Sequence, residues 1–97
     1  MAVKGQILIG ICYFALDGGH NIGQTGDGPN HTLKLIRDGV EGGVTNLVNE
    51  VDSVGCPGLY SVNLTAAEMN ADFIVLQGKS STAGVSIVPV GIATSAG

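Results

Sequence analysis

The sequence predicts an all-β fold: a β-sandwich of six to seven strands with one short helical turn, in a single domain over residues 1–97. Three observations predict it. Residues 57–94 read as a strand, one helical turn, a strand, a hairpin and a last strand. A long apolar segment near the N-terminus supplies a further strand. The chain shows neither a repeat nor a linker, and 97 residues are enough for one core.

The first predicted strand runs from Val3 to Leu16 and is apolar on both faces. One face carries Ile7, Ile9, Ile11 and Tyr13, and the other carries Leu8, Cys12, Phe14 and Leu16. We expect the core to cover one side and a neighbour the other. Gly10 predicts either a bulge or a change of sheet.

A secretory signal is the alternative interpretation of this segment, because Lys4 precedes the apolar residues. The small-residue cleavage pattern nearest to it, Gly10 to Cys12, would leave an apolar region too short for a signal. A first β-strand is therefore preferred.

Residues 17–30 are predicted to form a long loop, because Gly, Asn, Asp and Pro dominate them. A loop of more than about 12 residues in a compact domain is usually functional or disordered. We therefore expect this loop, together with residues 1–4, to contact a partner. The candidate interface residues are Lys4, His20, Asn21, Ile22, Gln24 and Asp27.

Two strands are predicted in the middle of the chain. His31–Arg37 places its leucines on one face, and the Asp38-Gly39 pair that follows is typical of a two-residue hairpin turn. Residues 41–43, Glu-Gly-Gly, predict a second break. Residues 47–51 predict a short strand, and residues 52–58 a loop.

The clearest strand is Leu59–Leu64, because apolar and polar side chains alternate along it. Thr65 and Glu68 then form the capping-box pattern, in which each side chain can bond the other residue's backbone amide. This pattern begins the predicted helical turn, Thr65–Asn70.

Two strands complete the predicted fold. Residues 73–77 are largely apolar on both faces and predict a central strand, and residues 78–84 predict a polar hairpin loop. The last strand, Val85–Thr94, contains Pro89, which places it at an edge or at a bulge.

Composition excludes some classes of partner and suggests another. The net charge of −4 is repelled by phosphate backbones, so we expect no binding to nucleic acid. The chain has no run of about 18 apolar residues, so the sequence predicts no membrane span. Charged residues are 12% of the chain, about half the usual share, which favours a surface partly covered by partners. A glycine-rich domain with a neutral polar surface is the alternative.

No catalytic or metal-binding motif emerges from the sequence. Gly78-Lys79-Ser80 imitates the end of a phosphate-binding loop but lacks its first glycine and its helix. His20 and His31 could bind a metal with Asp17 or Asp27, yet their spacing matches neither a zinc site nor a calcium loop. We therefore expect no enzyme, no cofactor and no metal.

The two cysteines, Cys12 and Cys56, do not form a disulfide framework. Cys12 lies in an apolar strand and is expected to behave as a small core residue. Cys56 precedes a proline in a turn. A bridge between the two is possible, but two cysteines carry no spacing signal.

From Asn30 onward, about two thirds of the chain, the sequence resembles small immunoglobulin-like β-sandwich domains of tailed-phage virion proteins. The matching pieces, in order, are Arg37-Asp38-Gly39, Asn49-Glu50-Val51-Asp52, Pro57-Gly58-Leu59-Tyr60 and Thr65-Ala66-Ala67-Glu68-Met69. These motifs are structural. The sequence departs from immunoglobulin domains proper at Phe73. It lies near the position of the corner tyrosine of those domains, and phenylalanine has no hydroxyl group to form that tyrosine's hydrogen bond.

The resemblance implies a virion part, and the small size favours a head decoration or cement protein on the outer capsid surface, made in the host cytoplasm. The expected partners are the major capsid protein and further copies of the chain, which the resemblance implies form a homotrimer. A tail or baseplate accessory protein is one alternative. The other is a sugar-binding adhesion module that uses loop 17–30. Against it, the aromatic residues all fall in predicted strands: Tyr13, Phe14, Tyr60 and Phe73.

Overall fold

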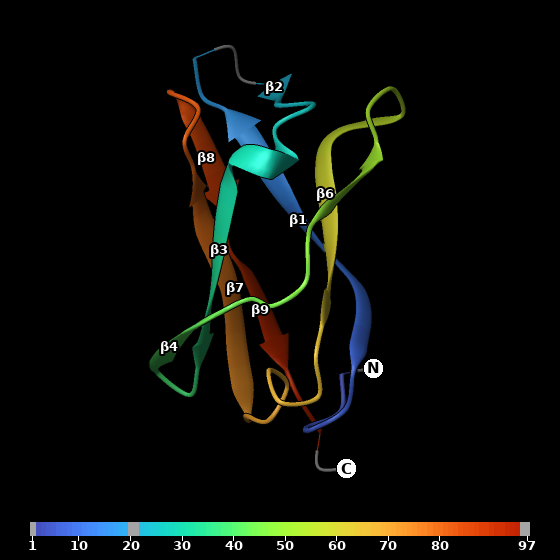
Figure 1. The fold of residues 1–97 in the computed structure, drawn as a ribbon, viewed down its shortest axis with the longest axis vertical. Coiled ribbons are helices and arrows are strands. Elements are labelled where there is room, and N and C mark those ends of the chain that lie inside the picture. The colour runs from blue at the N-terminus through green and yellow to red at the C-terminus, as the bar shows by residue number, and fades with distance from the viewer. Residues whose placement is uncertain (1, 20–21, 96–97) are drawn as a thin grey trace.

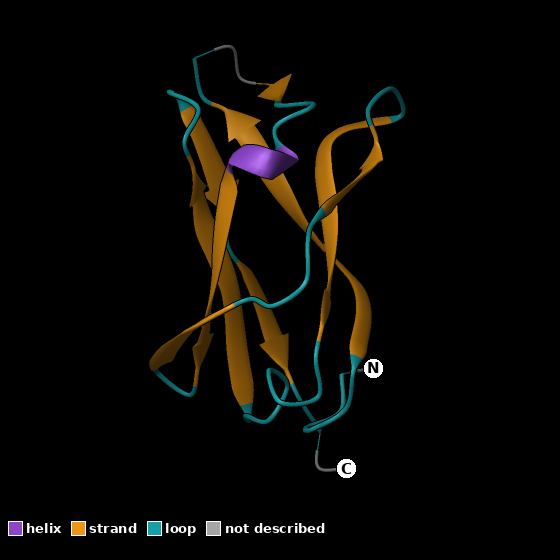
Figure 2. Ribbon diagram, in the orientation of Figure 1, coloured by secondary structure: helices purple, strands orange, loops and turns teal. Residues whose placement is uncertain are grey.

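Two antiparallel sheets pack as a sandwich in the structure, a computed structural model that describes residues 2–19 and 22–95 (Figures 1 and 2). The first sheet has the order β2-β1-β6-β5, and β8 also pairs with β1. The second has the order β4-β3-β7-β9. This confirms the predicted all-β sandwich.

The strands of the first sheet are β1 (Leu8–Asp17), β2 (Ile22–Gly23), β5 (Asn49–Asp52), β6 (Cys56–Leu64) and β8 (Val85–Val88). Those of the second are β3 (His31–Arg37), β4 (Val40–Gly43), β7 (Phe73–Ser80) and β9 (Val90–Ala93). A 3-10 helix, η1 (Gly28–Asn30), precedes β3. It is the helical segment of the described residues, and no helix there could cross a membrane.

Most of the strand order matches an immunoglobulin-like sandwich, but β8, from late in the chain, pairs with β1 where that fold has its first strand. Strands β1, β6 and β5 lie side by side as B, E and D do in that fold, and β4-β3-β7-β9 follow the order C′-C-F-G. Between β6 and β7 the chain crosses from one sheet to the other, but the predicted helical turn Thr65–Asn70 is there a hydrogen-bonded turn and not a helix.

The hairpin between β3 and β4 confirms one turn and corrects one break. Asp38 and Gly39 both have positive φ, 48° and 87°, as a two-residue hairpin requires. The predicted break at residues 41–43 is wrong, because Val40–Gly43 pairs with β3 as an edge strand. Glycines weaken a strand, but hydrogen bonds to β3 are sufficient to hold this short one.

A bulge at Gly10 changes which side chains of β1 face the core. The register with β6 shifts between Leu8 and Ile11, and Gly10 has a φ of +73°. Leu8 and Ile11 therefore both pack against the core, whereas Ile9 is exposed. The predicted grouping of Ile7 and Ile9 with Ile11 is wrong for this reason, since one inserted residue reverses the alternation.

The last predicted strand is divided at Pro89. Its first half, β8, pairs with β1 in the first sheet, and its second half, β9, pairs with β7 in the second. Proline has no amide hydrogen for a ladder, so it stands where the strand leaves one sheet for the other. Both halves are edge strands, as Pro89 predicts.

The capping box between β6 and β7 forms as predicted. The Thr65 amide donates to Glu68 Oε1 at 2.7 Å, and the Glu68 amide donates to Thr65 Oγ1 at 3.2 Å. Glu68 Oε2 also accepts from the Thr45 amide at 2.7 Å, which ties the turn to the chain before β5. The Met69 amide bonds to the Thr65 carbonyl at 3.1 Å and the Asn70 amide bonds to the Ala67 carbonyl at 3.3 Å, which closes the turn.

The N-terminal segment and the cysteines differ from expectation. Strand β1 begins at Leu8, not Val3, and residues 2–4 bond instead to Ser95. Cys12 lies half-buried on the outward side of β1 and not in the core, because the bulge at Gly10 reverses the alternation. Cys12 and Cys56 are both free thiols.

Candidate functional site

The predicted contact loop is held to the sandwich by one buried carboxylate, Asp27. The residue is 2% exposed. Its Oδ1 accepts hydrogen bonds from Asn30 Nδ2 at 3.1 Å and Thr82 Oγ1 at 2.5 Å. Its Oδ2 accepts from Ser80 Oγ at 2.6 Å and His31 Nε2 at 2.9 Å. Four side chains from η1, β3, β7 and the following loop thus converge on one residue of the 17–30 loop.

His31 lies between Asp27 and Tyr13. Because Nε2 donates to the carboxylate, Nδ1 is assigned as the acceptor for the Tyr13 hydroxyl, 2.8 Å away. Burial raises the pKa of Tyr13, so its hydroxyl keeps the proton that it donates. The Tyr60 ring packs edge-on against the imidazole at 4.6 Å between centroids. The imidazole is therefore fixed on each side.

The rest of the loop is bonded to the strands through its backbone. Tyr60 donates its hydroxyl hydrogen to the Gln24 carbonyl at 2.6 Å and accepts from the Asp27 amide at 2.9 Å. The Gln24 amide bonds to Ala15 at 2.8 Å, and the Gly26 amide bonds to Glu50 Oε1 at 2.9 Å. Strands β1, β5 and β6 all hold the segment, so it is pre-organised before any partner arrives.

Two glycines let the loop pass directly over β6. A Cβ on Gly23 would lie 2.0 Å from the Pro57 carbonyl oxygen, and one on Gly58 would lie 2.5 Å from the Gly23 Cα. Gly58 also has a φ of +88°, which L-residues rarely adopt. The backbones of β2 and β6 therefore touch without side chains between them.

The Tyr13–His31–Asp27 arrangement has the residue types of an acid–base relay but stabilises the fold. The side chains of His31 and Asp27 are 0% and 3% exposed, so a substrate does not reach them. The Ser80 hydroxyl donates to the carboxylate and not to the imidazole, so the imidazole is not placed to act as a base for Ser80. Among residues 2–19 and 22–95, no three His, Cys, Asp or Glu side chains come together as a metal site.

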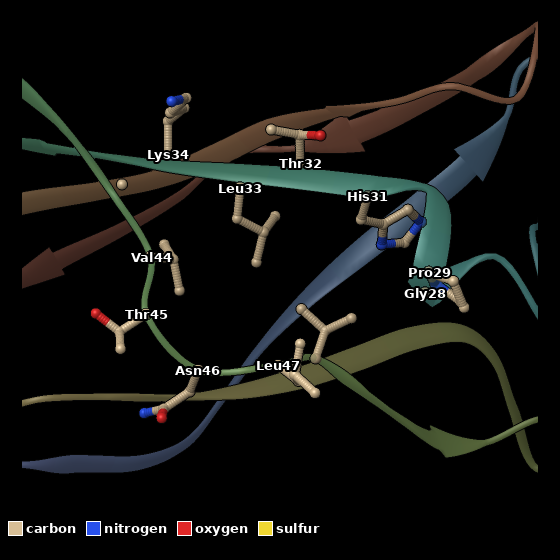
Figure 3. Close-up of a pocket in the computed structure, with 12 residues that line it drawn as sticks. Gly28, Pro29, His31, Thr32, Leu33, Lys34, Val44, Thr45, Asn46 and Leu47 are labelled. Atoms are coloured by element: carbon tan, nitrogen blue, oxygen red, sulfur yellow. The ribbon is translucent and has the colours of Figure 1, made fainter.

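Beside η1, an open groove of about 370 Å³ lies between β3 and the segment of residues 44–48 (Figure 3). Gly28 and Pro29 form one end, and Leu33 and Val44 point into the space between the two segments. Leu47, on its rim, is among the most exposed apolar side chains described. The groove is continuous with the anchored end of the loop, because both contain Gly28.

The predicted interface residues separate into three groups. Ile22 is exposed, Gln24 is half-buried, and Lys4 is exposed at the other end of the molecule, where it pairs with Asp72 at 3.1 Å. His20 and Asn21 lie outside the described residues. Asp27 differs from the expectation, because its buried carboxylate bonds within the chain and is not presented to a partner.

Sequence reasoning missed two exposed apolar residues near the site, Leu47 and Val54. The signal that could have found them is an aliphatic residue inside a polar turn segment. It also missed the cluster around Asp27, whose members Tyr13, His31, Ser80 and Thr82 are far apart in the chain.

Comparison of the chain with models of known protein families, with curated proteins and with solved structures gives no match.

Asp27 predicts a loss of stability in acid. Burial acts to raise its pKa, but hydrogen bonds from Ser80, Thr82, Asn30 and His31 outweigh it and lower the pKa from 3.8 to about 2. The stabilisation is complete above pH 3.8. It disappears as the pH falls through 2, because the unfolded chain takes up the proton first.

The expected loss between about pH 4 and pH 2 is roughly 2 kcal/mol of unfolding free energy. Urea unfolding at each pH measures it. Exposed Asp38 and Asp52 also have lowered pKa values, so the share of Asp27 is the difference between the wild type and Asp27→Asn. Parallel pH curves for the two proteins would contradict the assignment.

Proposed function

We propose that the chain is a structural protein of a virion, a decoration or cement protein that sits on the outer capsid surface and bridges major capsid subunits. The observation that carries the proposal is the anchoring of loop 22–30 by Asp27. A binding segment that is already ordered loses little conformational entropy on contact. A rigid contact surface suits a part that stabilises a lattice by holding neighbours at fixed positions.

The end of the sandwich that carries this loop presents apolar side chains. Ile22 on β2 is 59% exposed, and Val54 in the β5–β6 hairpin is 89% exposed. Figure 1 shows β2 and this hairpin at the same end of the molecule. Apolar contacts lose little to salt, and many modest contacts repeated on one particle add through multivalency. This end is the surface that we propose binds the capsid.

Two alternatives remain as proposals of lower rank. A tail or baseplate protein would use the same surface for binding. Locating the protein in the particle distinguishes this alternative from a capsid protein. A sugar-binding module needs exposed aromatic rings near the loop. Tyr13 and Tyr60 are buried, Phe14 is partly buried on β1, and half-exposed Phe73 begins β7 next to Ala93, away from the loop end. A glycan-array signal abolished by substitutions in loop 22–30 would favour that module.

The test is binding to particles of the virus that encodes the chain, prepared without this protein. We expect Ile22→Asp and Val54→Asp to weaken binding by tenfold or more, because each places a charge in an apolar contact. Val40→Asp is the matched control, since Val40 is an exposed valine on the β3–β4 hairpin at the opposite end.

Cosedimentation with the particles measures the affinity, and circular dichroism verifies the fold of each variant. The proposal fails if the wild-type protein does not bind. It also fails if particles without the protein keep full heads with unchanged resistance to heat and low salt.

A further inference from the structure

The ladder between β3 and β4 ends before β3 does. Its last pair places Lys34 opposite Gly43. Strand β3 itself begins at His31 and pairs with β7 over its whole length. After Gly43 the chain leaves the sheet and crosses to β5 (Figure 1). The start of β3 therefore has a neighbouring strand on one side and none on the other.

Leu33 carries the main-chain groups that face the vacant side. In an antiparallel ladder, successive residues direct their amide and carbonyl groups to opposite neighbours. The Ser81 amide bonds to the Asn30 carbonyl just before β3, and the Asp38 amide bonds to the Phe73 carbonyl just after it. The even-numbered residues of β3 thus bond to β7. The amide and carbonyl of Leu33 consequently point to the side that β4 has left.

These two groups of Leu33 have no hydrogen-bond partner among residues 2–19 and 22–95. The residue as a whole is only 8% exposed. Main-chain groups at buried positions are nearly always hydrogen-bonded in folded proteins. An unpaired amide and carbonyl on such a residue therefore indicate a place for a partner.

The unpaired groups belong to a wall of the groove beside η1 (Figure 3). Leu33 lies on one wall and Val44 on the other, and both side chains point into the space between the walls. An extended chain in this groove would continue the line of β4 along β3. It would bond to the main chain of Leu33 and place one side chain between Leu33 and Val44.

The size of the groove decides what kind of chain fits. It ends where β4 leaves β3 and, in the other direction, at η1, where Val48 lies close to Gly28. From His31 to Lys34 a strand advances about 10 Å, which corresponds to about three residues of an added strand. The edge of a folded sheet brings its neighbouring strands with it and would meet residues 44–48. A short extended segment, such as a chain end or an exposed loop, avoids that clash.

We propose that the groove binds a short extended segment of another protein, which adds to the edge of β3 as a strand. Main-chain hydrogen bonds give such complexes their affinity, and pockets for alternate side chains give their specificity. Residues directly opposite each other share a face of the sheet, so the residue opposite Leu33 is apolar and packs beside Val44. The next residue points to solvent with Thr32 and is polar. This inference does not depend on the proposed capsid function.

The probe is a pentapeptide with blocked ends, valine at its centre and serine at the other positions. Amide hydrogen exchange detected by NMR gives the measurement. In the free protein, the Leu33 amide is expected to exchange tenfold or more faster than the Leu35 amide, which lies opposite Gly42 in the closed part of the ladder. The peptide at millimolar concentration slows exchange of the Leu33 amide threefold or more. The same peptide with an N-methyl group on its valine cannot donate to the Leu33 carbonyl and leaves the exchange unchanged.

A substitution in the protein gives a second test. Val44→Asp places a charge in the groove and weakens binding of the peptide tenfold or more, measured by titration of the backbone NMR signals. Val40→Asp, the same change at an exposed valine of β4 outside the groove, leaves binding unchanged. Circular dichroism establishes that both variants fold, and if Val44→Asp does not, the N-methylated peptide decides the question.

A Leu33 amide as protected as that of Leu35 in the free protein overturns the inference, because the ladder would then be closed. Equal binding of the two peptides overturns it, as does the binding of neither. Protection of Leu33 that rises with protein concentration alone would make a second copy the occupant, which contradicts the proposal. Failure of capsid binding leaves these results unaffected, so the two proposals fail separately.

Discussion

Asp27→Ala is expected to lower the unfolding free energy by about 3 kcal/mol or more, because each buried hydrogen-bond donor left unsatisfied costs about 1–3 kcal/mol. The substitution removes the acceptor of four side-chain donors, on Asn30, His31, Ser80 and Thr82, of which the His31 imidazole is fully buried. It also releases loop 22–30 from β3 and β7. Urea denaturation followed by circular dichroism measures the change.

Asp72→Ala is the control for the loss of a carboxylate. Asp72 forms an exposed ion pair with Lys4, and such pairs contribute about 1 kcal/mol or less. Amide hydrogen exchange gives a second measurement, since the Gln24 and Gly26 amides should exchange faster in Asp27→Ala. Equal destabilisation by the two substitutions would show that Asp27 is not the anchor.

Gly58→Ala is expected to lower the unfolding free energy by about 3 kcal/mol or more. The new methyl group meets three backbone atoms at 2.5–3.0 Å, on Gly23, Ala15 and Gln24, and the residue has a φ of +88°. Positive φ costs about 1–3 kcal/mol, and forced overpacking adds a similar amount. Strand β2 must move off β6 to accept the methyl group.

Gly39→Ala separates the two contributions. Gly39 has nearly the same φ, +87°, but open space where its Cβ would stand. Thermal and urea unfolding of the two variants therefore give the cost of the close approach by difference. If the two substitutions were equally destabilising, the contact between β2 and β6 would carry no energetic weight.

Local sequence signals predicted the fold where a short segment determines its own structure. The alternation of Tyr60, Val62 and Leu64, the Asp38-Gly39 turn and the Thr65–Glu68 capping box all depend on neighbours in the chain. Strands β2 and β4 were missed for the opposite reason. Two or four residues with glycine carry almost no strand propensity, and pairing with a distant partner holds them.

The site could be predicted only as a region. Glycine and asparagine content identified loop 17–30, but the role of Asp27 depends on Ser80 and Thr82, more than fifty positions later. No spacing rule connects such residues. The charge of Asp27 at a loop position led to the prediction of an exposed contact residue. In the structure, four hydrogen-bond donors converge on its carboxylate and make burial favourable.

The pairing of β1 has a consequence for folding during synthesis. Its partners β6 and β8 are Cys56–Leu64 and Val85–Val88, so the ribosome makes them well after Asp17 ends the strand. At about 5–20 residues per second, the wait for β8 is roughly three to fourteen seconds. Until β6 is made, a strand that is apolar on both faces has no partner within its own chain except the two residues of β2. The nascent polypeptide thus exposes its most association-prone segment first, and a chaperone that binds extended apolar chain would find its site there.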